Sequence, residues 1–340
     1  MFREAAQAPA IVTAQVARNR GVIAAAAERL RAINPAFAAT LARGSSDHAA
    51  TFAKFLFETR LALPTLSHSP SIGALYGATS PRFRNRPLFA ISQSGRSPDL
   101  LRAAEGVRAA GGLVTALVND VDSPLAGLAD PTIPLLAGAE TSVAATKSFV
   151  ATLAALLHLT AIWSDDTTLG RAVDALGDTL DTAWTSDWSA AVQPIARTGR
   201  MLVLGRGPTL AIAGEAALKL KESCGIHAEA FSIAEVAHGP MTLVEQGDVV
   251  LAFGPLDQAR AGLADRIAAF VERGATVIAS GHADDIRRAT IRLDTEPDLH
   301  PLIAPVAQIL SFYRLADATA VARGRDPDHP PFLSKVTRTL

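Results

Sequence analysis

The sequence predicts an α/β protein of two tandem domains, each a parallel sheet flanked by helices in three layers. Its 340 residues have the length of two domains of ordinary size. Of these residues 49% are hydrophobic and only 5% are aromatic, a composition that suits helices packed on parallel sheets. Short apolar runs alternate with amphipathic segments, and the alternation restarts after residue 196. This pattern is typical of βαβ units with right-handed crossovers.

The first half of the chain predicts a leading helix followed by alternating strands and helices. Apolar residues at helical spacing predict a helix over 11–33, and Asn34-Pro35 ends it because a residue before proline disfavours helix. Residues 149–163 are apolar, but His158 interrupts them and they are shorter than the ~20 residues of a membrane span, which predicts a buried helix. The other expected elements are strands at 37–41, 87–91, 113–118 and 132–136 and helices from Asp47, Pro98 and Val143.

The second half repeats the pattern after a polar region at 165–200 that shows no strand signal. Leu41-Ala-Arg-Gly-Ser is similar to Leu204-Gly-Arg-Gly-Pro, which indicates an internal repeat. The elements expected here are strands at 201–204, 249–253, 275–279 and 291–293 and helices from Leu210, from Gln258 and over 303–321. The predicted division of the chain is a helical segment at 1–34, a first domain at 35–165, a linker at 166–196, a second domain at 197–323 and a tail at 324–340.

Charge and cysteine content exclude several classes of function. The chain has 32 Lys and Arg against 33 Asp and Glu, so no general field attracts nucleic acid or an anionic membrane. The single cysteine, Cys224, excludes an intramolecular disulfide and a cysteine-based metal cluster, and we interpret it as a core residue. We expect no cofactor and no metal. Residues 1–34 lack a continuous apolar signal segment, which predicts a cytoplasmic protein.

Two polar turns, each between a predicted strand and a predicted helix, favour an anion site. The turn after strand 87–91 contains Ser92, Gln93, Ser94 and Ser97, and hydroxyls together with backbone N–H groups at a helix start suit a phosphate dianion. A similar turn contains Ser45 and Ser46. The alternative is that Ser46, Ser94 or Ser97 only caps a helix. The sequence lacks both the Walker and the G-x-G-x-x-G patterns after these strands, which argues against nucleotide and NAD binding.

Three other features could carry chemistry. Glu215, Lys219 and Glu222 lie on one face of a predicted helix, and spacing alone favours an exposed ion pair worth about 0.3–0.5 kcal/mol. His238 precedes a Gly-Pro turn, where it is either a general acid or base or an ordinary surface residue. Lys335, considered by itself, is a solvated charge in a weakly structured tail.

Taken together, eight motifs resemble, in the same order, the isomerase part of glucosamine-6-phosphate synthase. The chain is thereby identified as a member of the double-SIS-domain phosphosugar isomerase family, and the resemblance implies the flavodoxin-like form of the three-layer fold. The similarity spans nearly the whole chain. The motifs are Gly-Ser-Ser-Asp-His48, Ser-Gln-Ser-Gly-Arg-Ser97, Ser-Val-Ala-Ala-Thr-Lys147, Leu-Gly-Arg-Gly207, Ala-Leu-Lys-Leu-Lys-Glu222, His-Ala-Glu-Ala-Phe231, Val-Ala-His-Gly-Pro240 and Leu-Ser-Lys335.

The resemblance implies a role for each candidate residue. Glu222 would move a proton between C2 and C1, His238 would assist ring opening, and Lys335 would lie at the sugar carbonyl. In the family the tail closes over the site and the histidine acts across a subunit interface, so a homodimer is expected. The residues implied in substrate binding are Ser45, Ser46, Ser92, Gln93, Ser94 and Ser97 for the 6-phosphate and Val143, Ala145 and Lys219 for the sugar.

No glutamine-hydrolysing domain with an N-terminal cysteine precedes the first SIS domain, so we expect no unaided use of glutamine. The chain looks most like the stand-alone SIS-type glucosamine-6-phosphate deaminases, with an amino-sugar 6-phosphate or fructose 6-phosphate as ligand. Two departures leave the substrate open, because Ala145 replaces a serine and Arg96 replaces an acidic residue of the synthase pattern. The alternatives are an ammonia-dependent synthase, a fructosamine-6-phosphate deglycase, a galactosamine-6-phosphate deaminase and a non-enzymatic sugar-phosphate sensor.

Overall fold

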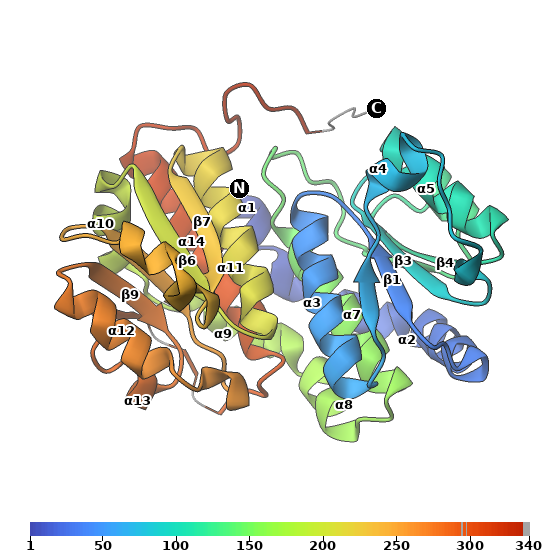
Figure 1. The fold of residues 1–340 in the computed structure, drawn as a ribbon, viewed down its shortest axis with the longest axis horizontal. Coiled ribbons are helices and arrows are strands. Elements are labelled where there is room, and N and C mark those ends of the chain that lie inside the picture. The colour runs from blue at the N-terminus through green and yellow to red at the C-terminus, as the bar shows by residue number, and fades with distance from the viewer. Residues whose placement is uncertain (294, 297, 336–340) are drawn as a thin grey trace. The chain divides into compact units, whose positions relative to one another are not determined.

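The computed structural model describes residues 1–293, 295–296 and 298–335, which form two compact units. The N-terminal unit contains residues 10–140, 147–177 and the described residues from 334 onward, and the C-terminal unit contains 1–9, 141–146 and the described residues of 178–333. A five-stranded parallel sheet with helices on its faces forms the centre of each unit (Figure 1). The predicted α/β fold with two parallel sheets is confirmed.

The sheet of the N-terminal unit has the strand order β2-β1-β3-β4-β5, with every neighbouring pair parallel. The chain moves outward from β1 to β2 and then returns to the other side of β1 for β3. This reversal creates a switch point between β1 and β3, which is where ligands bind in open α/β sheets. The strands are β1 (Ala38–Leu41), β2 (Thr65–Ser67), β3 (Pro87–Ser92), β4 (Leu113–Val118) and β5 (Thr132–Pro134).

Helices cover both faces of this sheet. Successive residues of β3 face opposite sides, so Leu88 packs with Val107 of α5 whereas the Phe89 ring lies 4.8 Å from that of Phe57 in α3. Local signals fix the helix starts: Pro98 is the first residue of α5, and the Asp166 side chain caps α8. The helices are α2 (Ala8–Ile33), α3 (Ser45–Arg60), α4 (Pro70–Ala74), α5 (Pro98–Ala109), α6 (Pro124–Leu128), α7 (Lys147–Trp163) and α8 (Thr167–Asp174).

Most elements expected in this unit are present, with two corrections. The apolar segment forms α7, which is buried along nearly its whole length, as predicted. The helix expected from Val143 begins instead at Lys147, because residues 141–146 form a loop of the C-terminal unit. Strand β2 was not predicted, because it is short and two of its three side chains are exposed. In the described part of the chain, no helix is long and apolar enough to cross a membrane.

The sheet of the C-terminal unit has the order β10-β9-β8-β6-β7, which is the same topology read from the opposite side. The repeat that the sequence indicated is therefore structural as well. The strands are β6 (Arg200–Gly205), β7 (His227–Ser232), β8 (Val249–Phe253), β9 (Thr276–Ser280) and β10 (Ile291–Leu293). Strand β7 was not predicted, because exposed His227 and Glu229 interrupt any apolar run.

Helices also cover both faces of the second sheet. Ile267 and Phe270 of α12 pack in one core with Val250 of β8, and Phe253 of β8 meets Phe312 of α14 with ring centroids 5.9 Å apart. The helix expected from Gln258 is split, because Gly262 at φ 84° separates a 3-10 turn from α12. The helices are α1 (Phe2–Ala5), α9 (Leu176–Thr185), α10 (Val192–Arg197), α11 (Pro208–Lys219), α12 (Leu263–Glu272), α13 (Ala283–Ile286) and α14 (Ala304–Ala322).

Candidate active site

Both predicted anion-binding turns lie at the β1/β3 switch point of the N-terminal unit. β1 and β3 are hydrogen-bonded neighbours, with Leu41 beside Ala90, so their carboxyl ends share one edge of the sheet. Ser45 and Ser46 begin α3 directly after β1, and the turn after Ser92 leads into α5. The structure therefore brings the two serine turns to the same place, at the starts of two helices.

The Ser92–Ser97 turn is held by its own backbone contacts. Ser92 Oγ accepts a hydrogen bond from the Gly95 N–H at 3.0 Å, and Ser94 Oγ accepts one from the Arg96 N–H at 3.4 Å. Gly95 has φ 62°, and a Cβ there would lie 2.2 Å from Ser123 Oγ. Only glycine fits this position, because both the backbone angle and the space exclude a side chain.

The capping interpretation of Ser46 and Ser97 is wrong. The N-cap of α3 is Gly44 and not Ser46. Ser97 occupies the N-cap position of α5, but its hydroxyl makes no capping hydrogen bond. Among the described residues, neither hydroxyl has a hydrogen-bond partner, so both are available to a ligand.

Arg96, which departs from the synthase pattern, pairs with Asp120 beside the same turn. Arg96 donates to Asp120 Oδ2 from Nη2 at 2.7 Å and from Nε at 3.2 Å. This hydrogen bonding lowers the pKa of the Asp120 carboxyl below its usual value. The two charges offset one another, so Arg96 adds little net positive charge to the turn.

Lys335 also belongs to the N-terminal unit, and its interpretation as a solvated tail charge is wrong. Its Nζ lies 3.1 Å from Oε2 of Glu140, whose side chain is fully buried. Glu140 also accepts hydrogen bonds from Ser148, from Oγ at 2.6 Å and from the backbone N–H at 3.2 Å. Sequence reasoning missed Glu140, although it stands only two residues before Ser142, where the motif that ends in Lys147 begins.

In the C-terminal unit, Glu215, Lys219 and Glu222 form one cluster at the end of α11. Lys219 Nζ hydrogen-bonds Glu222 Oε2 and lies 3.6 Å from Glu215 Oε1, which also accepts a hydrogen bond from Tyr313 at 3.0 Å. The prediction that these side chains lie together is thus correct, but the prediction that their ion pair is exposed is wrong. The side chains of Glu215 and Lys219 are 0% and 1% exposed, whereas Glu222 is 23% exposed.

Glu222 stands in a π-helical turn, Leu220–Cys224, that follows α11. Such turns widen the helix by one residue and occur often at functional sites. The turn ends at Gly225, which has φ 62°, and a Cβ there would lie 2.2 Å from the Arg325 guanidinium. Because Glu215 and Lys219 are enclosed, Glu222 is the member of the cluster that a ligand can reach.

Val143 and Ala145, the predicted sugar-binding residues, lie in the loop at 141–146 of the C-terminal unit. Both are partly exposed, while Ser142, Ala144 and Thr146 between and beside them are buried. Glu4 of α1 holds the start of this loop and accepts hydrogen bonds from the Thr141 N–H at 2.5 Å and Oγ1 at 3.1 Å. The side chains of Val143 and Ala145 are therefore accessible to a ligand, whereas those of the residues on either side of them are not.

His238 ends the 3-10 turn η4 (Glu235–His238) of the C-terminal unit and is exposed. Gly239 follows it with φ 154°. The predicted site residues are thus divided between the units. The serine turns and Lys335 belong to the N-terminal unit, and Lys219, Glu222, His238 and the 141–146 loop belong to the C-terminal unit.

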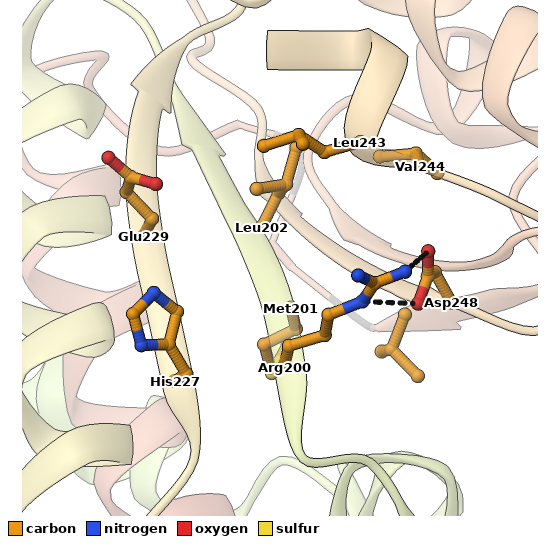
Figure 2. Close-up of a pocket in the computed structure, with 9 residues that line it drawn as sticks. Arg200, Met201, Leu202, His227, Glu229, Leu243, Val244 and Asp248 are labelled. Atoms are coloured by element: carbon orange, nitrogen blue, oxygen red, sulfur yellow. Dashed lines mark hydrogen bonds and ion pairs between the residues drawn. The ribbon is translucent and has the colours of Figure 1, made fainter.

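A cavity of about 260 Å³ in the C-terminal unit contains none of the predicted site residues (Figure 2). Arg200 and His227 begin β6 and β7, so the cavity lies at the amino end of the sheet, opposite the edge that binds ligands in such folds. Figure 2 shows His227 and Glu229 together on β7, apart from the Arg200–Asp248 pair. We assign this cavity no part in the site.

Cys224 is predicted to be chemically inert. The thiol is fully buried in the π turn, lies 3.4 Å from the Ala316 carbonyl oxygen, and has its pKa raised to about 12 by burial. Because the thiolate is the reactive form, we expect negligible alkylation by iodoacetamide at pH 8 in the folded protein and complete labelling of the one cysteine in urea. Mass spectrometry measures both states, and rapid native labelling would contradict the buried placement.

Both sheets have the flavodoxin-like strand order, with the serine turns at the switch point of one sheet and the Glu215–Lys219–Glu222 cluster beside the other. These features define a double-domain α/β protein. A family model of the SIS domain matches residues 38–162 and 195–322. The chain therefore belongs to the SIS-domain family, and the predicted double-SIS organisation is confirmed.

Individual proteins that are similar to this chain are consistent with its membership in this family. A solved candidate phosphosugar isomerase from Silicibacter pomeroyi DSS-3 is 41% identical, with a TM-score of 0.91, over 96% of this chain and 99% of that one. A glutamine–fructose-6-phosphate aminotransferase (isomerizing) from Thermococcus kodakarensis is 31% identical over 98% of this chain and 57% of that protein. The chain spans about half the length of the curated relatives it matches.

The glucosamine-6-phosphate deaminase of Thermotoga maritima has the same fold. It is 20% identical, with a TM-score of 0.74, over 97% of this chain and 100% of that one. At this identity the similarity concerns the fold alone.

Among the described residues of the present protein, no group of three or more His, Cys, Asp or Glu side chains is placed to hold a metal ion.

Proposed function

We propose that this protein is an amino-sugar-phosphate isomerase that releases ammonia, with glucosamine 6-phosphate as substrate and fructose 6-phosphate as product. The observation that carries the proposal is the Glu222 cluster. Lys219 holds the accessible Glu222 carboxylate in one position, and a general base must be positioned within reach of the proton that it takes. Membership in the SIS family and similarity to phosphosugar isomerases support the same class of reaction.

The serine turns support recognition of a 6-phosphate. Available hydroxyls at Ser46 and Ser97 stand at the starts of α3 and α5, and the start of a helix favours a bound anion. Ser45, Ser92, Gln93 and Ser94 complete the proposed cradle. A phosphate dianion can accept hydrogen bonds from both turns, whereas a neutral sugar would leave these donors poorly matched.

The proposed reaction moves protons in ring opening and in isomerisation before hydrolysis. His238 protonates the ring oxygen while the C1 hydroxyl loses its proton to water, which opens the sugar to its C1 aldehyde and makes the C2 proton acidic. Glu222 takes that proton and returns it to C1 through an enolamine, which gives a ketimine at C2. Water adds to the ketimine carbon, and the nitrogen leaves as ammonia. Glucosamine 6-phosphate and water are thereby converted to fructose 6-phosphate and ammonia.

Lys335 is proposed to act as a hydrogen-bond donor. The buried Glu140 carboxylate offsets its charge and holds Nζ in place. We therefore propose that Lys335 donates a hydrogen bond to the sugar oxygen and does not form a Schiff base. The same contact holds Lys335 of the tail against Glu140, which supports the proposal that the tail closes over the site.

The test is release of ammonia and fructose 6-phosphate from glucosamine 6-phosphate by the purified protein. Galactosamine 6-phosphate and fructosamine 6-phosphate are assayed in parallel, and fructose 6-phosphate with ammonium tests the reverse reaction. Turnover of glucosamine 6-phosphate supports the assignment as a deaminase. If another of these substrates is turned over faster, the protein is instead assigned the activity on that substrate. Binding of these phosphates without any turnover would favour a sensor.

We also propose that the protein is a cytoplasmic homodimer in which His238 acts in the partner's site. Four large apolar side chains within residues 66–76 are exposed, namely Leu66, Ile72, Leu75 and Tyr76, and such a concentration is typical of an association surface. His238 is itself exposed, as a residue that serves another subunit must be. Sedimentation velocity measures the oligomeric state.

Mixing two inactive variants is expected to restore activity. In a heterodimer of His238→Ala and Glu222→Gln chains, one of the two sites contains an intact Glu222 and an intact His238. After unfolding and refolding of an equal mixture, random pairing gives about a quarter of wild-type specific activity, because half of the dimers are mixed and each has one intact site. Each variant refolded alone is the control. If His238 acts within its own chain, the mixture stays inactive.

A further inference from the structure

Arg43 and Asp99 form an ion pair between the segments that carry the two serine turns. Arg43 lies between the end of β1 and Ser45, and Asp99 lies in the first turn of α5, two residues after Ser97. Arg43 donates to Asp99 Oδ2 from Nε at 2.7 Å, and its Nη2 lies 2.6 Å from the same oxygen. The pair joins positions 56 residues apart in the sequence.

The burial of Asp99 makes this pair a fixed contact. Its side chain is 2% exposed, and its other oxygen accepts a hydrogen bond from the Leu100 N–H at 2.9 Å. A carboxylate removed from water in this way needs a cationic partner, so the structure strongly favours keeping Arg43 against it. The segment after β1 cannot move away from the start of α5 without breaking the pair.

Arg43 acts by fixing the positions of the segments that it joins, and not by adding positive charge to the phosphate site. Asp99 offsets the guanidinium directly. Asp47, in the first turn of α3, also interacts with Arg43: partial burial raises the pKa of its carboxyl, and the charge of Arg43 acts to lower it. With two carboxylates near one guanidinium, Arg43 brings no surplus positive charge to a phosphate. What it does supply is a constraint on the spacing of Ser45 and Ser46 from Ser97.

We propose that Arg43 and Asp99 are positioning residues that hold the two serine turns at the spacing a phosphate dianion requires. The inference rests on the proposed phosphate site and deepens it. Hydrogen-bond donors act on a ligand only when they converge, and small displacements of such donors lower affinity strongly. The pair therefore acts on substrate binding and not on the proton transfer.

The test compares Arg43→Ala/Asp99→Ala with the wild type. The double variant removes both charges, so no unpaired carboxylate remains buried. We expect the Kd for inorganic phosphate, measured by calorimetry, and the KM for glucosamine 6-phosphate to rise about tenfold or more, with kcat changed less than about threefold. Arg43→Lys, which keeps the charge but loses the planar fork, is expected to lie between the double variant and the wild type.

Arg60→Ala/Asp166→Ala is the matched control. This second Arg–Asp pair joins the other end of α3 to the start of α8, and Asp166 is also largely buried. Its loss also removes the cap of α8, so the control reproduces a general loss of stability without touching the serine turns. We expect its phosphate Kd and KM to equal those of the wild type.

Two results would overturn the inference: a wild-type phosphate Kd in Arg43→Ala/Asp99→Ala, or an equal rise in Kd in the Arg60/Asp166 control. A wild-type protein that binds no phosphate overturns the inference together with the cradle. If the wild type binds phosphate but turns over no sugar phosphate, only the proposed reaction fails, and the calorimetric comparison still decides the role of the pair.

Discussion

Glu222→Gln is expected to lower kcat for glucosamine 6-phosphate by about 10²–10⁴-fold, the range that a positioned general base contributes. The amide has the shape of the carboxylate and can still accept the hydrogen bond from Lys219, so the π turn should keep its structure. It cannot accept a proton from C2. We therefore expect KM and the phosphate Kd to change little, because the serine turns belong to the other unit.

Glu272→Gln is the matched control for this variant. Glu272 is an exposed carboxylate of the same unit at the end of α12, where it pairs with Arg288 at 3.0 Å. Steady-state ammonia release is the measurement for both variants. Undiminished kcat in Glu222→Gln would remove Glu222 from the mechanism, and an equal loss in Glu272→Gln would mean that the assay reports general damage.

Lys219→Met is expected to destabilise the protein by about 3–5 kcal/mol, the cost of leaving a buried charge without its partner. Glu215 would remain in a fully enclosed site with the hydrogen bond from Tyr313 but without the ammonium. Urea unfolding measures the change as a lower midpoint. The free energy of unfolding should fall far more than for Lys54→Met, because Lys54 and Glu58 form an exposed pair of the same i,i+4 spacing worth less than about 1 kcal/mol.

Lys219→Met/Glu215→Gln separates stability from function. A neutral amide at position 215 can still accept the Tyr313 hydrogen bond, so most of the lost stability should return. Activity should stay low, because the ammonium that orients Glu222 is still absent. If the double variant is no more stable than Lys219→Met, the destabilisation comes from lost packing and not from the unpaired carboxylate.

The central strands of both sheets could be predicted from the sequence, because a strand buried on both faces requires a local run of apolar residues. β3, β4 and β8 are buried on both faces and therefore appear as continuous apolar runs. The edge strands β2 and β7 were missed, since one is only three residues long and the other carries exposed polar side chains. Residues 143–146 were mistaken for the start of a helix, because their composition does not show that they belong to a loop whose first residue is held by Glu4.

The sequence by itself determined the polar turns, the order of the motifs and the helical face shared by Glu215, Lys219 and Glu222. Only the tertiary structure decided which of these charges are buried. Spacing along a helix fixes the neighbours of a side chain, but its exposure depends on segments such as α14, which supplies Tyr313. The pairs Arg43–Asp99 and Lys335–Glu140 join residues 56 and 195 positions apart. No local pattern encodes such contacts, because they exist only once the parallel strands and the tail have been brought together.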